Sequence, residues 1–304
     1  MSSYRGRRNP RIRQITLAAL DAAALRGFVA KWSYRSGLHG KLRVTHHEVR
    51  IEAGNPLLPA PLVLAFASDF HAGPLTHPEL FSSLVGELNN HRPDVLLLGG
   101  DFVSAKAEHV DALTERLSQC APPLGKYAVL GNHDLWTDDQ HLVRQLGTAG
   151  VEVLVNRNLP LPSPFDSVSI CGIDDPWTGS PDVAKAFHGA QPIRIFLTHS
   201  PDGLLLLDKE RFDVGFAGHT HGGQIAFRDG TPIVDAGGPL SRTYSRGRFE
   251  IAGNGPMIVS RGVGCSHVPI RINSDPELVI CTLRPEIFGE GHRNGSRSAV
   301  SRRT

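Results

Sequence analysis

The sequence predicts an α/β fold in which a parallel sheet with its helices packs face to face against a second, largely β half. Short apolar runs recur along the chain, and segments of helical periodicity lie between them. After Gly222 the chain changes to short strands with frequent Gly and Pro. Apolar runs that alternate with helices are typical of βαβ crossovers, which pair their strands in parallel.

Strands are expected where an apolar run is short and ends in a turn signal. The alternation over 44–51 predicts an edge strand, and the continuous run 62–67 predicts a strand covered on both faces. Further strands are expected at 95–98, 127–130, 151–155, 168–173, 193–197, 214–217, 257–260 and 278–283.

Three helices are expected between the first strands. Thr76 with Glu79, and Thr137 with Gln140, form the pattern of a capping box, in which side chains at a helix start satisfy free backbone N–H groups. The helix between these two has an apolar face formed by Val110, Leu113 and Leu117.

Composition limits the classes of protein. The 304 residues are 40% hydrophobic with a net charge of +2, which suits a globular protein and argues against nucleic-acid binding. Four cysteines without a CxxC pair argue against a disulfide framework or a cysteine zinc site, and favour reduced thiols in the cytoplasm. We expect a basic, partly helical extension over 1–43, one domain over 44–285 and a disordered basic tail over 286–304.

The segment 15–32 is apolar but interrupted by Asp21, Arg26 and Lys31, so it predicts neither a transmembrane helix nor a signal peptide. As a helix it would gather Phe28 and Trp32 on one face. Two interpretations stay open. The helix packs on the domain, or it lies on the inner membrane with the basic residues before it contacting lipid head groups.

Five short motifs each follow a predicted strand. They are Asp69-Phe70-His71, Gly99-Gly100-Asp101-Phe102, Gly131-Asn132-His133-Asp134, Thr198-His199 and Gly218-His219-Thr220-His221. In a parallel sheet the carboxyl ends of strands lie at one edge, where ligands bind. Each motif alone is compatible with a turn or a helix cap, whereas all five in this order indicate a common site.

The residue types indicate metal chemistry. Asp69 and His71 point to the same side of an extended chain, and the carboxylate of Asp101 has two oxygens that can bridge two cations. Mixed nitrogen and oxygen ligands suit two divalent ions of Mn, Fe or Zn, and neither a thiolate site nor an all-oxygen Mg or Ca site. Such a pair holds a phosphate and activates a water for in-line attack. His133 could stabilise the transition state or protonate the leaving oxygen, and Asp134 could orient it.

Most other histidines are expected to have no part in this site, because none of them follows a strand within a motif. They are His46, His47, His77, His91, His109 and His141. His267 stays open, because its loop at 262–269 could line the site.

The ordered motifs D-x-H, G-D, G-N-H-[DE], a lone His and G-H-x-H resemble the calcineurin-like metallophosphoesterase superfamily. The segments 259–264, 269–273 and 276–278 are similar to one bacterial branch, which includes phosphodiesterases and enzymes resembling UDP-2,3-diacylglucosamine pyrophosphatase. The resemblance covers about 44–283. It implies a four-layer α-β-β-α sandwich, in which two packed mixed sheets are flanked by helices.

The resemblance also implies roles for the motif residues. Asp69, His71 and His221 would hold the first metal. Asn132, His199 and His219 would hold the second, with Asp101 bridging and His133 catalytic. Many relatives carry a second Asp after the G-D motif that supports the catalytic histidine. This chain has Phe102-Val103-Ser104-Ala105 there, so the support must come from elsewhere, and Asp134 is a candidate.

The implied function is hydrolysis of a phosphodiester or pyrophosphate bond by a metal-bridging hydroxide. Two alternatives stay open: an enzyme like UDP-2,3-diacylglucosamine pyrophosphatase at the membrane surface, and a non-enzymatic scaffold on the same fold. The partners expected are the phosphorylated substrate and, through the N-terminal segment, a membrane surface. The sequence does not predict an oligomeric state.

Overall fold

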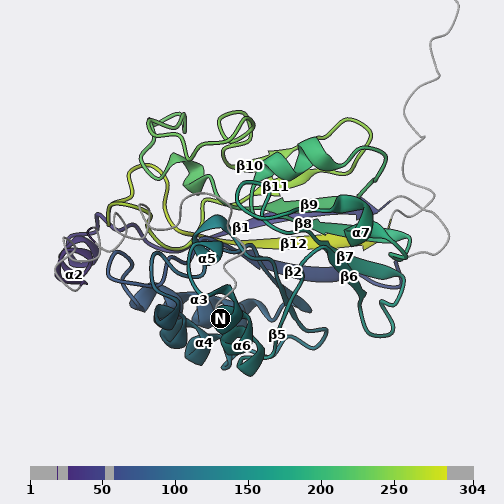
Figure 1. The fold of residues 1–304 in the computed structure, drawn as a ribbon, viewed down its shortest axis with the longest axis horizontal. Coiled ribbons are helices and arrows are strands. Elements are labelled where there is room, and N and C mark those ends of the chain that lie inside the picture. The colour runs from purple at the N-terminus through teal and green to yellow at the C-terminus, as the bar shows by residue number, and fades with distance from the viewer. Residues whose placement is uncertain (1–18, 20–26, 52–57, 286–304) are drawn as a thin grey trace, which may run out of the picture.

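The computed structural model describes residues 19, 27–51 and 58–285. Two six-stranded mixed sheets lie face to face, with helices on their outer sides (Figure 1). The four-layer α/β sandwich expected from the sequence is therefore confirmed. Residues 1–26 of the extension expected over 1–43, apart from residue 19, and the tail expected over 286–304 lie outside the described residues.

The first sheet has the order β1-β12-β2-β3-β4-β5. Its strands are β1 Arg43–Ile51, β12 Glu277–Pro285, β2 Leu62–Ala67, β3 Val95–Leu98, β4 Lys126–Ala128 and β5 Val151–Val153. Strand β1 lies at the edge, as the alternation predicts. Strand β12 is antiparallel to β2, and the other neighbours in this sheet are parallel.

The second sheet has the order β10-β11-β9-β8-β7-β6. Its strands are β10 Gly247–Phe249, β11 Met257–Val259, β9 Val214–Ala217, β8 Ile193–Leu197, β7 Val168–Gly172 and β6 Arg157–Pro160. The prediction that the second half begins after Gly222 is wrong, because β6 to β9 already belong to this sheet and β12 returns to the first. Periodicity predicts a strand, but it does not say which sheet the strand joins.

The helices cover the two outer faces. They are α2 Phe28–Arg35, α3 Glu79–His91, α4 Asp111–Leu117, α5 Asn132–Leu135, α6 Asp139–Thr148 and α7 Val183–Phe187, with 3₁₀ turns η2 Ala107–Val110, η3 Pro201–Leu206 and η4 His221–Gly223. Of these, α3, α4 and α6 lie below the first sheet in Figure 1, and α7 lies beside the second. No helix among the described residues is both long and apolar enough to cross a membrane.

Strand β2 shows why the layers hold together. Leu64 and Phe66 are buried between the two sheets, whereas Ala65 and Ala67 pack in the cluster that includes α3, α4 and α6. Successive side chains of a strand point to opposite faces, so a strand apolar at every position suits a layer covered on both sides.

Both predicted capping boxes are wrong. The Thr76 hydroxyl accepts a hydrogen bond from Cys265 N at 2.9 Å, so a distant loop uses it and α3 begins without a side-chain cap. Helix α6 is capped by Asp138, which accepts from His141 N at 3.0 Å. Thr137 instead donates its hydroxyl to Asp134 O. Aspartate is the better N-cap residue, so the helix starts one position later than the pattern suggested.

Candidate metal centre

The five motifs come together where the strands of both sheets end. Asp69 and His71 follow β2, Asp101 follows β3, and Asn132 begins α5 after β4. His199 follows β8, and His219 with His221 follows β9. Backbone bonds join the segments, since Asp69 N donates to Gly100 O at 2.9 Å and Gly218 N donates to His199 O at 2.8 Å. The structure therefore brings together all the metal-ligand candidates predicted from the sequence.

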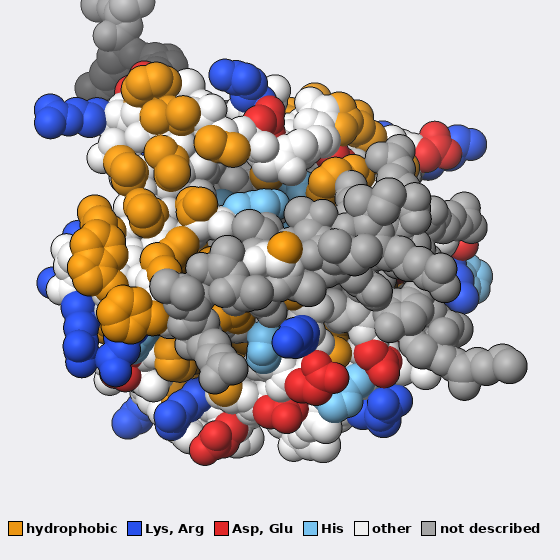
Figure 2. Space-filling model, turned by 60° about the vertical axis from the view of Figure 1, so that its left-hand side comes forward, with side chains coloured by type: hydrophobic (Ala, Val, Ile, Leu, Met, Phe, Trp, Pro, Cys, Tyr) orange, Lys and Arg blue, Asp and Glu red, His pale blue; other side chains and the backbone are white. Residues whose placement is uncertain are grey.

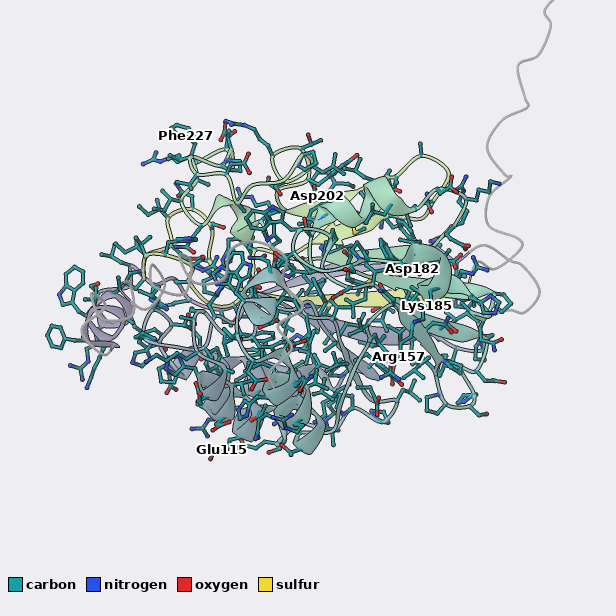
Figure 3. The ribbon with its side chains drawn as sticks, in the orientation of Figure 1. Glu115, Arg157, Asp182, Lys185, Asp202 and Phe227 are labelled. Carbon is teal, nitrogen blue, oxygen red and sulfur yellow. The ribbon has the colours of Figure 1, made fainter. Side chains whose placement is uncertain are left out.

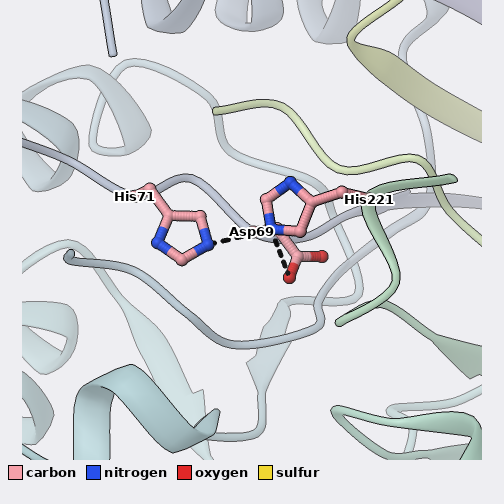
Figure 4. A group of neighbouring side chains, drawn as sticks. All are labelled: Asp69, His71 and His221. Carbon is pink, nitrogen blue, oxygen red and sulfur yellow. Dashed lines mark hydrogen bonds and ion pairs between the residues drawn. The ribbon is translucent and has the colours of Figure 1, made fainter. Parts of the chain in front are cut away.

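One cluster consists of Asp69, His71 and His221, whose ligand atoms lie close enough to share an ion. The Nε2 atoms of His71 and His221 are 2.9 Å apart, and His221 Nε2 is 3.5 Å from Asp69 Oδ1 (Figure 4). All three side chains are buried.

A second cluster consists of Asp101, His199 and His219. His199 Nε2 is 3.3 Å from His219 Nδ1 and 3.1 Å from the amide oxygen of Asn132. Asn132 thus adds a neutral oxygen to this cluster, as the sequence predicted.

Asp101 lies between the two clusters. Its Oδ2 atom is 3.5 Å from His71 Nε2 and 3.5 Å from His199 Nε2, so one carboxylate oxygen faces a histidine of each cluster. Its Oδ1 atom accepts a hydrogen bond from His133 N at 2.8 Å, which orients the carboxylate. This is the arrangement expected of a bridging ligand.

The donor set fits divalent cations. Burial lowers the pKa of His71, His219 and His221, that of His219 to about 3, so these imidazoles are neutral as metal ligands must be. The pKa of His199 is raised, because the attraction of the Asp101 carboxylate outweighs burial, and a bound cation would take the place of that positive charge. Burial also raises the pKa of Asp69 to about 6, and the nearby Asp101 adds to this effect. A cation between the groups would compensate both buried carboxylates and occupy the space where two ring nitrogens face each other.

Gly131 leaves room for this arrangement. A Cβ atom there would contact Asp101 Oδ1 and would lie 2.7 Å from both Asp101 N and His199 Cε1. We predict that Gly131→Ala lowers hydrolytic activity and metal content at least about tenfold, because the bridging carboxylate must move, and misplacement by about 1 Å costs about 10²-fold in rate.

Gly86→Ala is the matched control. Gly86 lies in α3, and an added Cβ would meet nothing within 4 Å. This variant should keep full activity and gain about 0.5–1 kcal/mol of stability. Equal metal content and activity in both variants would contradict the tight packing inferred at Gly131.

His133 is oriented by a backbone carbonyl. Its Nδ1 atom is 2.7 Å from Ser104 O, so Nδ1–H donates and Nε2 is left for other contacts. The ring packs edge-on against His71 with centroids 4.7 Å apart, and against Trp136 at 4.5 Å. The stretch that lacks the expected second Asp thus supports the histidine through its main chain.

The position of His133 permits a second interpretation. With His71 and Asp101 it forms a third group whose ligand atoms could share an ion. A role as metal ligand and a role as proton donor are therefore separate hypotheses for this residue.

Asp134 does not orient His133 by a hydrogen bond; its carboxylate is used by backbone groups. It accepts from Phe102 N at 2.8 Å, Val103 N at 3.3 Å and Gly131 N at 2.9 Å. Burial, followed by the charge of Asp101, raises its pKa to about 8. Asp134 therefore joins the G-D and G-N-H segments from behind.

We predict that Asp134→Ala destabilises the protein by about 1–3 kcal/mol or more, because it leaves buried N–H groups without an acceptor. Urea unfolding followed by circular dichroism measures the change. Asp111→Ala, at an exposed site of α4, is the control and should change stability by less than about 0.5 kcal/mol. An unchanged unfolding midpoint in Asp134→Ala would refute this role.

The remaining histidines lie at different distances from the candidate metal groups. The six assigned no part belong to none of the candidate metal groups among the described residues. His267, which the sequence left open, lies beside the site, with its ring centroid 6.2 Å from that of His133.

Two contributors were missed by sequence reasoning. The carbonyl of Ser104 has no sequence signal. Arg271 is buried behind His221, with Nη2 at 3.2 Å from His221 Nδ1, while its other N–H groups donate to Arg261 O, Gly264 O and Ser274 O. The signal for Arg271 was its place in the segment 269–273 that resembles the bacterial branch.

Buried Asp and His groups at the strand ends of two packed sheets form a candidate site for divalent metal ions. The family model described as calcineurin-like phosphoesterase matches residues 62–223. The chain belongs to this family and is a phosphoester hydrolase.

Sequence similarity to two bacterial proteins agrees with this family. The chain is 30% identical over 230 residues to an uncharacterized metallophosphoesterase of Aquifex aeolicus, covering 72% of this chain and 83% of that protein. It is 31% identical over 235 residues to phosphodiesterase YaeI of Escherichia coli, covering 74% and 83%. A solved 5'-nucleotidase precursor from Thermus thermophilus matches at 13% identity with a TM-score of 0.42, covering 73% of this chain and 55% of that chain. The present chain thus spans about half the length of that nucleotidase.

Proposed function

We propose that the protein hydrolyses a phosphodiester or pyrophosphate bond at a centre of two divalent metal ions. The observation that carries the proposal is the position of Asp101 Oδ2, at 3.5 Å from a histidine nitrogen of each cluster. A diester substrate is also favoured by the similarity to phosphodiesterase YaeI.

In this proposal Asp69, His71 and His221 hold one ion, and Asn132, His199 and His219 hold the other, with Asp101 between them. Bound divalent ions neutralise charge on phosphate oxygens and make a water nucleophilic at neutral pH. Mn, Fe and Zn are the candidates, because the ligands are imidazole, carboxylate and amide.

His133 and Asp134 act differently in this proposal. Ser104 O holds the His133 ring, so Nε2 is the nitrogen that can meet the substrate and give a proton to the leaving oxygen. Asp134 fixes the loops that carry Asp101 and Asn132 through its three backbone contacts. It is therefore a positioning residue.

The test uses full-length protein, stripped with a chelator and reloaded with Mn²⁺, Fe²⁺ or Zn²⁺. Hydrolysis of bis-p-nitrophenyl phosphate should return with metal and exceed that of p-nitrophenyl phosphate. Elemental analysis should give two ions per chain. A chain that binds two ions but hydrolyses neither substrate, nor any of a panel of sugar nucleotides, would favour the alternative of a non-enzymatic scaffold.

A more specific alternative is that the substrate is a lipid-linked nucleotide like UDP-2,3-diacylglucosamine, which the protein hydrolyses at a membrane surface. The resemblance of the segments 259–264 and 269–273 to the bacterial branch supports it. Turnover of acylated sugar nucleotides well above that of their deacylated forms would support this substrate class, and equal turnover would count against it.

A further inference from the structure

Exposed apolar side chains gather beside the metal centre. They come from α2, from the loop 225–234 and from the loop 266–272, and are 44–67% exposed: Phe28, Trp32, Phe227, Ile233, Val234 and Ile272. We call this set the apolar band. Figure 2 shows hydrophobic side chains along one side of a hollow in which histidines are visible. Phe227 points away from the body of the protein (Figure 3).

The three segments are held together by hydrogen bonds. Arg271 N donates to Leu38 O at 2.8 Å, just after α2, and the Ser33 hydroxyl donates to Pro269 O. Ala226 N donates to Ile272 O at 2.9 Å, which joins the loop 225–234 to the loop 266–272. These bonds hold the three segments that carry the band next to one another in the fold.

Helix α2 faces outward with its aromatic residues. Ala30 and Ser33 are its buried residues, whereas Phe28 is 67% and Trp32 is 55% exposed. The apolar face expected from the sequence is thus exposed to solvent. The opposite face of the helix packs on the domain, where the Ser33 hydroxyl donates a hydrogen bond.

The same surface borders the catalytic centre. His267 lies in the loop 266–272, with its ring 6.2 Å from that of His133. Gln224, at the start of the loop 225–234, donates to Ser266 O and Val268 O at 3.0 and 2.8 Å and follows the turn that carries His221. A surface that binds the loop 266–272 of the band therefore lies next to the candidate metal ligands.

Basic residues are interspersed with the apolar ones. Lys31 and Arg35 are exposed on α2, which has no acidic residue, and Arg228 follows Phe227. Asp229 and Asp235 lie in or next to the same loop, and the hydrogen bonds that they accept from Thr231 N and Gly237 N leave them negatively charged, so the excess of positive charge on the band lies on α2. Aromatic residues next to Lys and Arg are typical of surfaces that lie in the head-group region of a bilayer.

We propose that the apolar band docks the protein on an anionic lipid surface, with the metal centre facing the bilayer. The sequence neighbours Lys31-Trp32 and Phe227-Arg228 favour a bilayer, because an aromatic ring next to a cation suits the boundary between acyl chains and head groups. Docking would present a phosphoester attached to a lipid to the metal ligands. That substrate class rests on the function proposed above, whereas the docking itself does not.

The experiment is co-sedimentation of full-length protein with vesicles of phosphatidylcholine and phosphatidylglycerol at 3:1, and with phosphatidylcholine alone. Wild type should bind the anionic vesicles, and raising the salt should weaken binding. The double variants Phe28→Ser/Trp32→Ser and Phe227→Ser/Val234→Ser should each lose about tenfold or more in vesicle affinity. Lys31→Gln/Arg35→Gln should lose about as much on anionic vesicles and nothing on neutral ones.

Leu205→Ser is the matched control, because Leu205 is 59% exposed on η3, outside the band. It should bind vesicles like wild type. All these variants keep the N-terminal segment and should hydrolyse a soluble diester at the wild-type rate, which also shows that they fold. Vesicle binding with no diester hydrolysis would refute the proposed function but leave the docking surface intact.

Three results would overturn the proposal. One is equal vesicle binding by wild type and both apolar double variants. Another is no binding of anionic vesicles by wild type. The third is a dimer in sedimentation velocity that the double variants dissociate, which would assign the band to a second copy of the chain.

Discussion

Asp101→Ala is expected to abolish hydrolysis of bis-p-nitrophenyl phosphate, with kcat/KM falling at least about 10³-fold. Removing a ligand shared by both clusters would cost several kcal/mol of transition-state stabilisation, and each 1.36 kcal/mol is a factor of ten. The structural basis is Oδ2, which faces His71 Nε2 and His199 Nε2, each at 3.5 Å. Kinetics at saturating Mn²⁺ and elemental analysis of the same samples measure the effect.

Asp101→Asn distinguishes the role of Oδ1 as a hydrogen-bond acceptor from the role of Oδ2 between the two clusters. In the wild type, His133 N donates to Oδ1 of Asp101 at 2.8 Å. The asparagine keeps this acceptor but removes the negative charge. We expect it to fold like wild type and to be nearly as inactive as the alanine variant. Asp111→Ala, at an exposed aspartate of α4, should be fully active. Two bound metals and near wild-type turnover in Asp101→Ala would refute the bridging role.

His133→Gln is expected to lower kcat by about 10²–10⁴-fold, with a smaller change in KM. Its ring is held by Ser104 O at 2.7 Å, which leaves Nε2 for the substrate. Metal content should stay at the wild-type value if His133 transfers a proton.

Metal content decides between the two hypotheses for His133. If it serves as a ligand with His71 and Asp101, His133→Gln should lose bound metal together with activity. His188→Gln, at an exposed residue after α7, is the control and should change neither. A His133→Gln variant with wild-type kcat would remove this residue from catalysis altogether.

The chain's local patterns predicted much of this arrangement. The apolar run Leu62–Ala67 is strand β2, and the motif residues lie at the ends of five strands. These predictions succeed because a buried strand has a distinctive composition and parallel strands end at one edge. Sheet membership was wrong for β7 to β9, because it depends on contacts that no local pattern encodes.

The groups that hold the candidate site residues in position were harder to predict. Asp134 follows His133 in sequence, yet its carboxylate faces Phe102 N and Gly131 N. Both residues lie in the short helix α5, and adjacent side chains of a helix do not face each other. The carbonyl of Ser104 is common to any residue type, so no side-chain pattern could have identified it.

Strand β12 has a consequence for how the protein is made. It lies between β1 and β2, and pairs with residues 43–51 on one side and 62–66 on the other. The motif residues, up to His221, are therefore synthesised before the strand that completes the sheet beneath Asp69. Because contacts so distant in sequence form late in folding, the nascent chain carries every metal-binding side chain before it can hold them in place. Metal loading is thus expected to follow synthesis of the residues that form β12.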